Sequence, residues 1–229
     1  MITQKFNIKE INLEYFVVIN QIKFNLTQFL QLFTIDYEEE ALKHLFTLTQ
    51  ELQNRNKGSM IQFIKDKYLL NENHLFTACY YVQKAFYYNT NISNKKNIEF
   101  LLYLSANRQI SKGIETFGID IKDLRNGHLL FCIISQSNTI GKINSELLSI
   151  LKVKEIELAI NSLLNEKITT IKEYYGISDN QIFSILNSYG IKLVDKQISN
   201  IDLDSIAIAL FDLICEKMAL LNLEKMKIR

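Results

Sequence analysis

The segment Asn97–Ile119 constrains the fold more than any other part of the chain. Its apolar residues are spaced as one face of a helix would place them, and they are Leu101, Leu104, Ile110, Ile114 and Phe117. Three small or polar residues, Ser105-Ala106-Asn107, interrupt this face and predict a break between two short helices. Gly118 is suited to end the second helix. We expect the rest of the chain to hold this helix pair in place.

Arg108 and Gln109 follow the break, where the second helix is predicted to begin. A rigid helix pair would present the planar guanidinium of Arg108 to a phosphate or a base edge. The upstream lysines Lys84, Lys95 and Lys96 would add positive charge, and helix N-terminal amides would add donors. Together these groups favour a short single-stranded nucleic acid end over a duplex. The alternative is that Arg108 and Gln109 are ordinary exposed residues at a helix start.

Charge and cysteine content narrow the class of protein. With 26 basic and 25 acidic residues in a chain of 229, the net charge is +1, which argues against a domain coated in basic charge for gripping long duplexes. The cysteines Cys79, Cys132 and Cys215 are far apart in apolar runs, so we expect reduced, buried thiols. The longest apolar region, 206–223, is broken by charged residues and does not predict a membrane span. We expect a soluble, cytoplasmic protein.

Three segments have the apolar pattern of strands, and they are Glu14–Phe24, Met60–Leu70 and His128–Ile134. In the first segment, the residues expected on one face are Phe16, Val18, Ile22 and Phe24. Helical patterns fill most of the remaining chain, although 191–200 is polar and uncertain. We therefore predict an α+β fold, with residues 1–229 forming one helix-rich domain around a small mixed β-sheet flanked by helices.

Capping residues mark the predicted helix starts. Asn25 precedes a short helix, Asp36 precedes a clearer one with Glu39 three residues on, and Asn71 precedes a third. The third helix has a buried stripe of Leu75, Ala78, Val82 and Ala85, with Gln83 and Lys84 on its exposed side. The region 142–189 predicts several short helices separated by glycine.

The last helix is predicted to open at Asp202 or Asp204 and to be the longest. Its apolar stripe is wider than contact with one sheet requires, so we expect part of it to bind a partner. The candidate partner-binding residues are Ile206, Leu210, Leu213 and Leu221.

Catalysis and metal binding have little support in the sequence. The histidines His44, His74 and His128 form no metal-ligand or nucleophile motif. Gly113 and Gly118 are not spaced as in a phosphate-binding loop. We therefore expect a protein that is not an enzyme, with no catalytic residue, no metal, no cofactor and no small-molecule substrate.

Two segments have a helix-turn-helix pattern, 106–119 and 168–191, and the second has a glycine in its turn. A DNA-binding transcriptional regulator is therefore the alternative function. Its recognition helix should present basic residues to phosphates, yet Asp179, Asn180 and Gln181 open the second helix of 168–191. The alternative therefore ranks below binding of a single-stranded end.

Three segments resemble one family, in the same order along the chain. The run YLSANRQISKGIETFGI (103–119) is similar to the signature of the kinase-binding (TPRKB-type) subunit of the KEOPS complex. NENHLFTACYYVQKAF (71–86) is similar to that family's histidine-alanine helix, and IALFDLICEKMALLNL (208–223) to its C-terminal helix. The resemblance covers 60–134 and the C-terminal helix, whereas 142–200 is longer than in compact members of the family.

The resemblance implies a non-catalytic subunit that binds the small kinase-like ATPase of KEOPS. That complex installs threonylcarbamoyl on the adenosine beside the tRNA anticodon, and in archaeal relatives this subunit also holds the single-stranded CCA end of tRNA. Carried over by motif, the RNA-binding residues are Ser105, Arg108, Gln109 and Ile110, with Asn107 and Lys84 as weaker candidates. The family's glycine after the serine is Ala106 here, so a left-handed backbone at this position would be strained.

Overall fold

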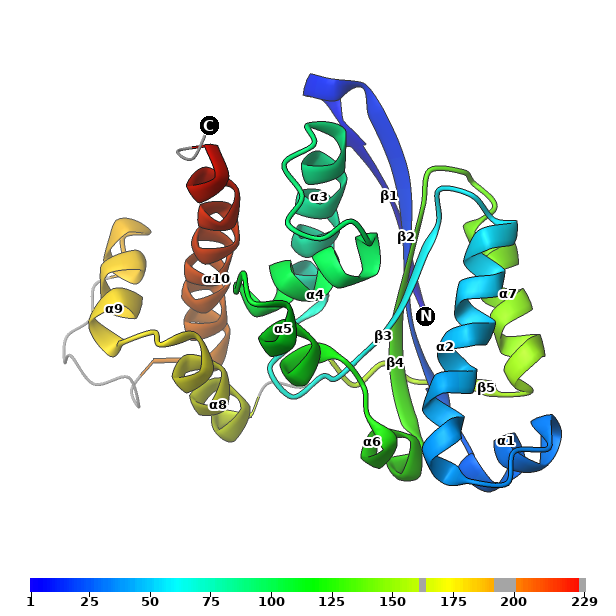
Figure 1. The fold of residues 1–229 in the computed structure, drawn as a ribbon. Helices are drawn as coiled ribbons and strands as arrows, with labels where there is room; N and C mark the ends of the chain where they lie inside the picture. The colour runs from blue at the N-terminus through cyan, green and yellow to red at the C-terminus, as the bar shows by residue number, and fades with distance from the viewer. Residues whose placement is uncertain (161–163, 192–200, 227–229) are drawn as a thin grey trace.

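The computed structural model describes residues 1–160, 164–191 and 201–226, with side chains described up to Leu221 in the last range. A five-stranded sheet runs through its middle (Figure 1). The strands are β1 (Ile2–Ile8), β2 (Leu13–Lys23), β3 (Met60–Ile64), β4 (His128–Ser135) and β5 (Lys154–Ile156). Their order is β1-β2-β4-β3, and β5 pairs with the end of β2 that lies beyond β1.

The α+β, helix-rich fold class is confirmed, but the sheet is not mixed. Every strand pair among the described residues is antiparallel. The chain crosses from β2 to β3 through two helices, which leaves these two strands running the same way. They are not neighbours, however, because β4 lies between them and runs opposite to both.

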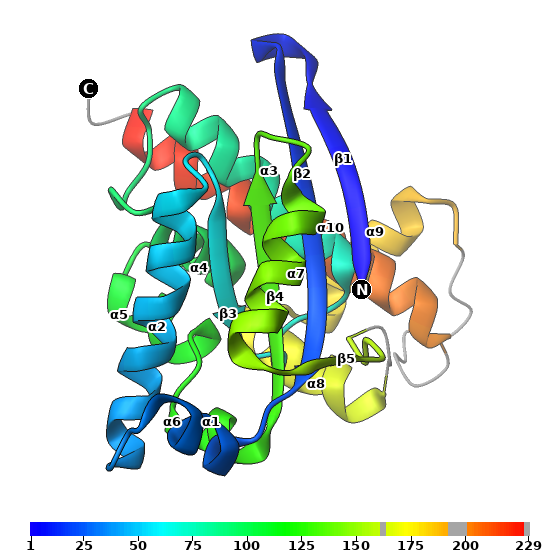
Figure 2. The ribbon, with the colours of Figure 1, turned by 90° about the vertical axis from the view of Figure 1, so that its right-hand side faces the viewer.

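Helices cover both faces of the sheet (Figures 1 and 2). Side chains of β2 alternate between the faces, with Phe16, Val18 and Ile22 on one side and Tyr15 and Val17 on the other. The predicted grouping of the even-numbered residues is therefore confirmed. The helices on their face are α1 (Leu26–Phe33), α2 (Glu38–Arg55) and α7 (Ile140–Leu151).

The opposite face is covered by α3 (Glu72–Tyr87) and α4 (Lys96–Ser105), and α10 (Leu203–Met226) packs over both. The helices α8 (Asn165–Tyr175) and α9 (Asp179–Ser188) pack against α10 in turn. The short helices α5 (Ile110–Phe117) and α6 (Ile121–Asn126) lead from α4 back to β4. No helix in the described part of the chain is long and apolar enough to cross a membrane.

The predicted caps are confirmed at two helices and wrong at one. The side chains of Asn25 and Asn71 accept first-turn amide hydrogen bonds at 3.0 and 3.1 Å. Helix α2 instead has Tyr37 at its N-cap, without a side-chain hydrogen bond, so Asp36 is not the cap. The acidic residues 38–40 in the first turn place negative charge at the positive end of the helix.

Strand lengths and two edges differ from the prediction. β3 ends at Ile64 rather than Leu70, because the Lys65 amide leaves the sheet and donates to the Phe117 carbonyl at 2.9 Å. β1 and β5 were not predicted from the sequence, since most of their side chains are exposed and polar.

Gln83, predicted to be exposed, is buried. The thiols of Cys79 and Cys132 are free and buried, and that of Cys215 is free and half-buried. The polar segment 192–200 lies outside the described residues.

Candidate functional site

The predicted helix break is present. Helix α4 ends at Ser105, and Ala106 takes the left-handed conformation, with φ 46° and ψ 38°. The amides of Ala106 and Asn107 donate to the Tyr103 and Leu102 carbonyls at 3.0 and 3.2 Å, which closes the end of α4. The Asn107 side chain then accepts the Gln109 amide at 2.9 Å and starts the turn into α5. The two helices are therefore separate and held at a fixed angle.

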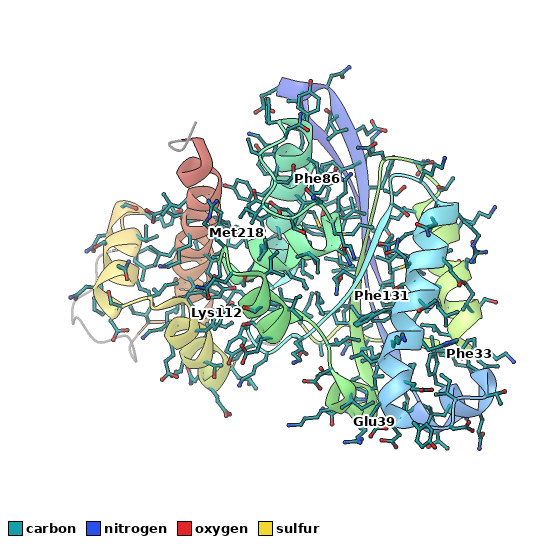
Figure 3. All side chains as sticks on the ribbon, viewed as in Figure 1. Phe33, Glu39, Phe86, Lys112, Phe131 and Met218 are labelled. Carbon is teal, nitrogen blue, oxygen red and sulfur yellow. The ribbon has the colours of Figure 1, made fainter. Side chains whose placement is uncertain are left out.

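A cleft of about 730 Å³ opens at this break. Its walls come from the break itself, the turn after β3, α5, the end of α8 and α10. Four lysines line it against a single carboxylate, Glu115, and they are Lys65, Lys67, Lys112 and Lys217. Lys112 lies on the side of α5 that faces α8 and α10 (Figure 3). The cleft therefore has an excess of positive charge.

The four lysines are not equally available to a ligand. The Lys65 ammonium is paired with Asp120 at 2.9 Å and lies 3.8 Å from Asp123. The hydrogen bond from Lys65 lowers the pKa of the Asp120 carboxyl. Lys67 Nζ lies 5.0 Å from the centre of the Tyr68 ring. Lys112 and Lys217 make no ion pair with any side chain in the described part of the chain, so they are the cations best placed to meet an anion.

Two tyrosines give the cleft an aromatic wall. The rings of Tyr68 and Tyr174 are stacked, with centroids 4.4 Å apart and planes inclined by 27°. The Tyr174 hydroxyl donates to the Ser105 carbonyl at 3.3 Å, and burial raises its pKa. The stack is therefore fixed to the helix break. In proteins that bind single-stranded nucleic acids, aromatic rings commonly stack on unpaired bases while nearby lysines contact the phosphates.

Behind this wall a buried hydrogen-bonded network holds α8 to α4. Tyr175 donates to the Leu104 carbonyl, and its hydroxyl lies 3.4 Å from His74 Nε2. Burial lowers the pKa of His74 to about 4, so its imidazole is neutral near pH 7. His74 is therefore a structural residue of the core.

The residues predicted to bind RNA lie at or beside the cleft, with one exception. Ser105 and Asn107 line it, and Gln109 and Ile110 are exposed at the start of α5. Arg108 is half-buried, and its Nη1 donates a hydrogen bond to the Leu221 carbonyl at 2.9 Å. This bond ties the break to the end of α10. The role of these residues in RNA binding stays a prediction.

Lys84 is the exception, and the two other upstream lysines, Lys95 and Lys96, do not line the cleft either. The Lys84 ammonium donates to the Tyr80 hydroxyl at 3.0 Å, near the end of α3, and it does not line the cleft. Lys95 and Lys96 lie at the first turn of α4, the end opposite the break. The lysines of the cleft come instead from segments that are distant in the sequence. Of the four, only Lys112 lies within the segment 103–119 that resembles the family signature, three residues after Gln109.

Within the described residues, no group of three or more histidine, cysteine, aspartate or glutamate side chains could hold a metal ion.

A comparison with models of known protein families shows which family the chain belongs to. A family model described as kinase binding protein CGI-121 matches residues 40–222, from α2 to α10. The chain belongs to the CGI-121 family. The resemblance to the kinase-binding subunit seen in 103–119 is thus confirmed at family level, and the match also runs through 142–200. No curated protein sequence matches the chain.

The apolar stripe predicted to bind a partner packs inside this CGI-121 member. Its four side chains are at most 6% exposed and belong to the core cluster on the α3–α4 face of the sheet, and they are Ile206, Leu210, Leu213 and Leu221. The width of the stripe arises because α10 contacts α3 and α4 on one side and α8 and α9 on the other. Burial of these residues speaks against direct contact with a partner.

The helix-turn-helix alternative has the right backbone but the wrong chemistry. Helices α8 and α9 are joined at Gly176, which has φ +59°, as the sequence predicted. The exposed first turn of α9 carries Asp179, Asn180 and Gln181, and Asp179 is paired with Lys172. A first turn without a basic side chain offers no cation to the phosphates that flank a DNA groove. Of 106–119, only Ile110–Phe117 is helical, so this segment holds one helix and not two.

Proposed function

We propose that this CGI-121 family member is a non-catalytic accessory subunit of the KEOPS complex, which makes threonylcarbamoyladenosine in tRNA. It binds the small kinase subunit of that complex and the single-stranded CCA end of tRNA. The observation that carries the RNA part of the proposal is the lysine-lined cleft at Ala106. Family membership carries the kinase part.

The shape and charge of the cleft favour an RNA end. Lys112 and Lys217 stand on two of its walls, and the Tyr68–Tyr174 stack forms a third. A duplex needs a long basic track, whereas a net charge of +1 leaves positive charge only in local patches. A few unpaired nucleotides fit a concave site that offers both stacking and phosphate contacts.

Lys112→Gln tests the RNA site with little risk to the fold, because Lys112 is exposed. Loss of one phosphate contact should weaken binding of tRNA by roughly fivefold, about 1 kcal/mol. The slope of log affinity against log salt should fall by about 0.7 for a single-stranded contact. Lys122→Gln, an exposed lysine on α6 outside the cleft, is the matched control and should bind as the unaltered protein does.

Arg108→Ala should weaken tRNA binding as well, but it also removes the hydrogen bond to the Leu221 carbonyl. Lys112→Gln is therefore the cleaner variant. Equal affinity for tRNA with and without its CCA end would contradict the RNA part. Failure to co-elute with the KEOPS kinase from the same organism would contradict the kinase part. Turnover of a substrate with no partner present would contradict the non-catalytic role.

A further inference from the structure

A second basic cleft, of about 620 Å³, lies at the opposite end of α4 from the break. It is formed where α2 ends, β3 begins and α4 makes its first turn, segments that lie at the same end of the sheet in Figure 2. Its charged lining residues are Lys57, Lys95 and Lys96, and no carboxylate lines it. Side-chain amides of Gln50, Gln53 and Asn54 complete the polar wall. The cleft thus combines three positive charges with neutral hydrogen-bonding groups.

The first turn of α4 contributes backbone donors to this cleft. Lys95 occupies the N-cap position, and no side chain caps the amides that follow it. Lys96 and Asn97, the first residues of the helix, line the cleft. Amides at a helix N-terminus have no partner within the helix and attract anions.

Lys96 is an independent indication that an anion belongs here. Its side chain is half-buried, with Nζ 5.5 Å from the centre of the Phe86 ring, and burial lowers its pKa. It donates to Gln83 Oε1 at a long 3.4 Å and is paired with no carboxylate among the described residues. A partly desolvated ammonium is costly without a counter-charge.

The polar side chain that backs Lys96 is also incompletely satisfied. Gln83 is 1% exposed, and its Nε2 has no hydrogen-bond partner in the described part of the chain. Buried amide groups normally have partners in a folded protein. Gln83 does not itself line the cleft, but it touches Lys96, so an oxyanion beside the Lys96 ammonium would be held one contact away from this amide.

Two acidic residues near these segments interact with groups other than the three lysines. Glu99, in the first turn of α4, is buried, and its Oε2 accepts the amides of Ile92 and Ser93 at 2.9 and 2.7 Å. At the end of α2, Arg55 is paired with Glu146 at 2.6 Å. Within the described part of the chain, none of the three lysines forms an ion pair.

We propose that this cleft binds a phosphate group, carried either by an RNA backbone or by a free nucleotide. The site is distinct from the cleft at Ala106, because ten residues of α4, about 15 Å of helix, separate the two. It does not depend on the KEOPS assignment.

The test is a titration followed by the NMR signals of the Lys96 and Asn97 backbone amides and the Gln83 side-chain amide. The probes are inorganic phosphate, ATP and a hexauridylate that has no CCA end. The variant Lys57→Gln/Lys95→Gln removes two exposed lysines of the cleft. The control Lys152→Gln/Lys154→Gln makes the same change in charge at two exposed lysines elsewhere.

We expect at least one probe to shift these three signals and to bind at least fivefold more weakly to the variant, with the control unchanged. If phosphate and ATP give this result, the phosphate group alone is sufficient. If only hexauridylate does, the ligand is an RNA backbone. Equal weakening in variant and control would attribute the effect to net charge and overturn the site, as would the absence of any shift with all three probes.

Discussion

Ala106→Gly should relieve backbone strain at the centre of the candidate site. Ala106 is in the left-handed region, at φ 46°, where its Cβ crowds the following carbonyl. This conformation costs an L-residue about 1–2 kcal/mol, and glycine avoids most of that cost. The position ends α4 and sets the direction of the chain toward α5. The strain is therefore a property of the break and not of the surrounding core.

The expected magnitude comes from a comparison with Ala219→Gly. Ala219 is half-buried, as Ala106 is, but it lies inside α10, where φ is right-handed. Both variants lose one methyl group and gain the same freedom in the unfolded chain, so these effects largely cancel. Ala219→Gly should cost about 1 kcal/mol. Ala106→Gly should be more stable than Ala219→Gly by about 1–2 kcal/mol, the strain itself.

Urea unfolding followed by circular dichroism measures both free energies. For a chain of this size the difference corresponds to roughly 2–8 °C in Tm. If Ala106→Gly destabilises the protein as much as Ala219→Gly does, the left-handed backbone carries no strain, and the argument from its φ is refuted.

The remaining predictions concern the core and its pH dependence. Leu213→Glu should unfold the protein, because Leu213 is 5% exposed in the core and a buried unpaired carboxylate costs several kcal/mol; circular dichroism that is unchanged would show the site to be tolerant. Since the folded-state pKa of His74 is about 4 and its ordinary value is 6.5, the unfolded chain binds more protons between these values, and stability should fall as pH drops through this window. The loss should reach up to about 3 kcal/mol. His74→Gln should remove this pH-dependent loss of stability. An equal loss in the variant would show that other groups cause the pH dependence.

Local signals predicted the parts of the fold that are stabilised locally. The caps at Asn25 and Asn71 and the break at Ala106 depend on residues within one turn of each other, so their pattern is visible in the sequence. Asp36 shows the limit of such patterns, because a capping residue two positions before the first helical residue looks the same as one in place.

The burial of Gln83 and the composition of the cleft depend on tertiary packing, which the sequence pattern does not show. Gln83 looked exposed because polar residues on a helix usually are, yet α3 is packed between the sheet, α4 and α10. The same holds for the cleft, whose walls include Lys65, Lys112, Tyr174 and Lys217 from four separate segments. Apart from Lys112, which lies within 103–119, these residues have an ordinary sequence context, and only the topology of the fold brings them together.

The helix α10 belongs both to the cleft at Ala106 and to the core of this CGI-121 member. It supplies Lys217 to the cleft, and the Leu221 carbonyl accepts the hydrogen bond from Arg108. Its apolar stripe is meanwhile consumed by α3, α4, α8 and α9, so the helix cannot rotate without exposing core residues. A kinase that binds elsewhere on the surface would therefore leave the cleft proposed to bind RNA intact unless it displaced α10 as a rigid body. The two proposed binding functions are thus expected to be separable by mutation on the cleft side, where Lys112 and Lys217 make no ion pair with the described side chains.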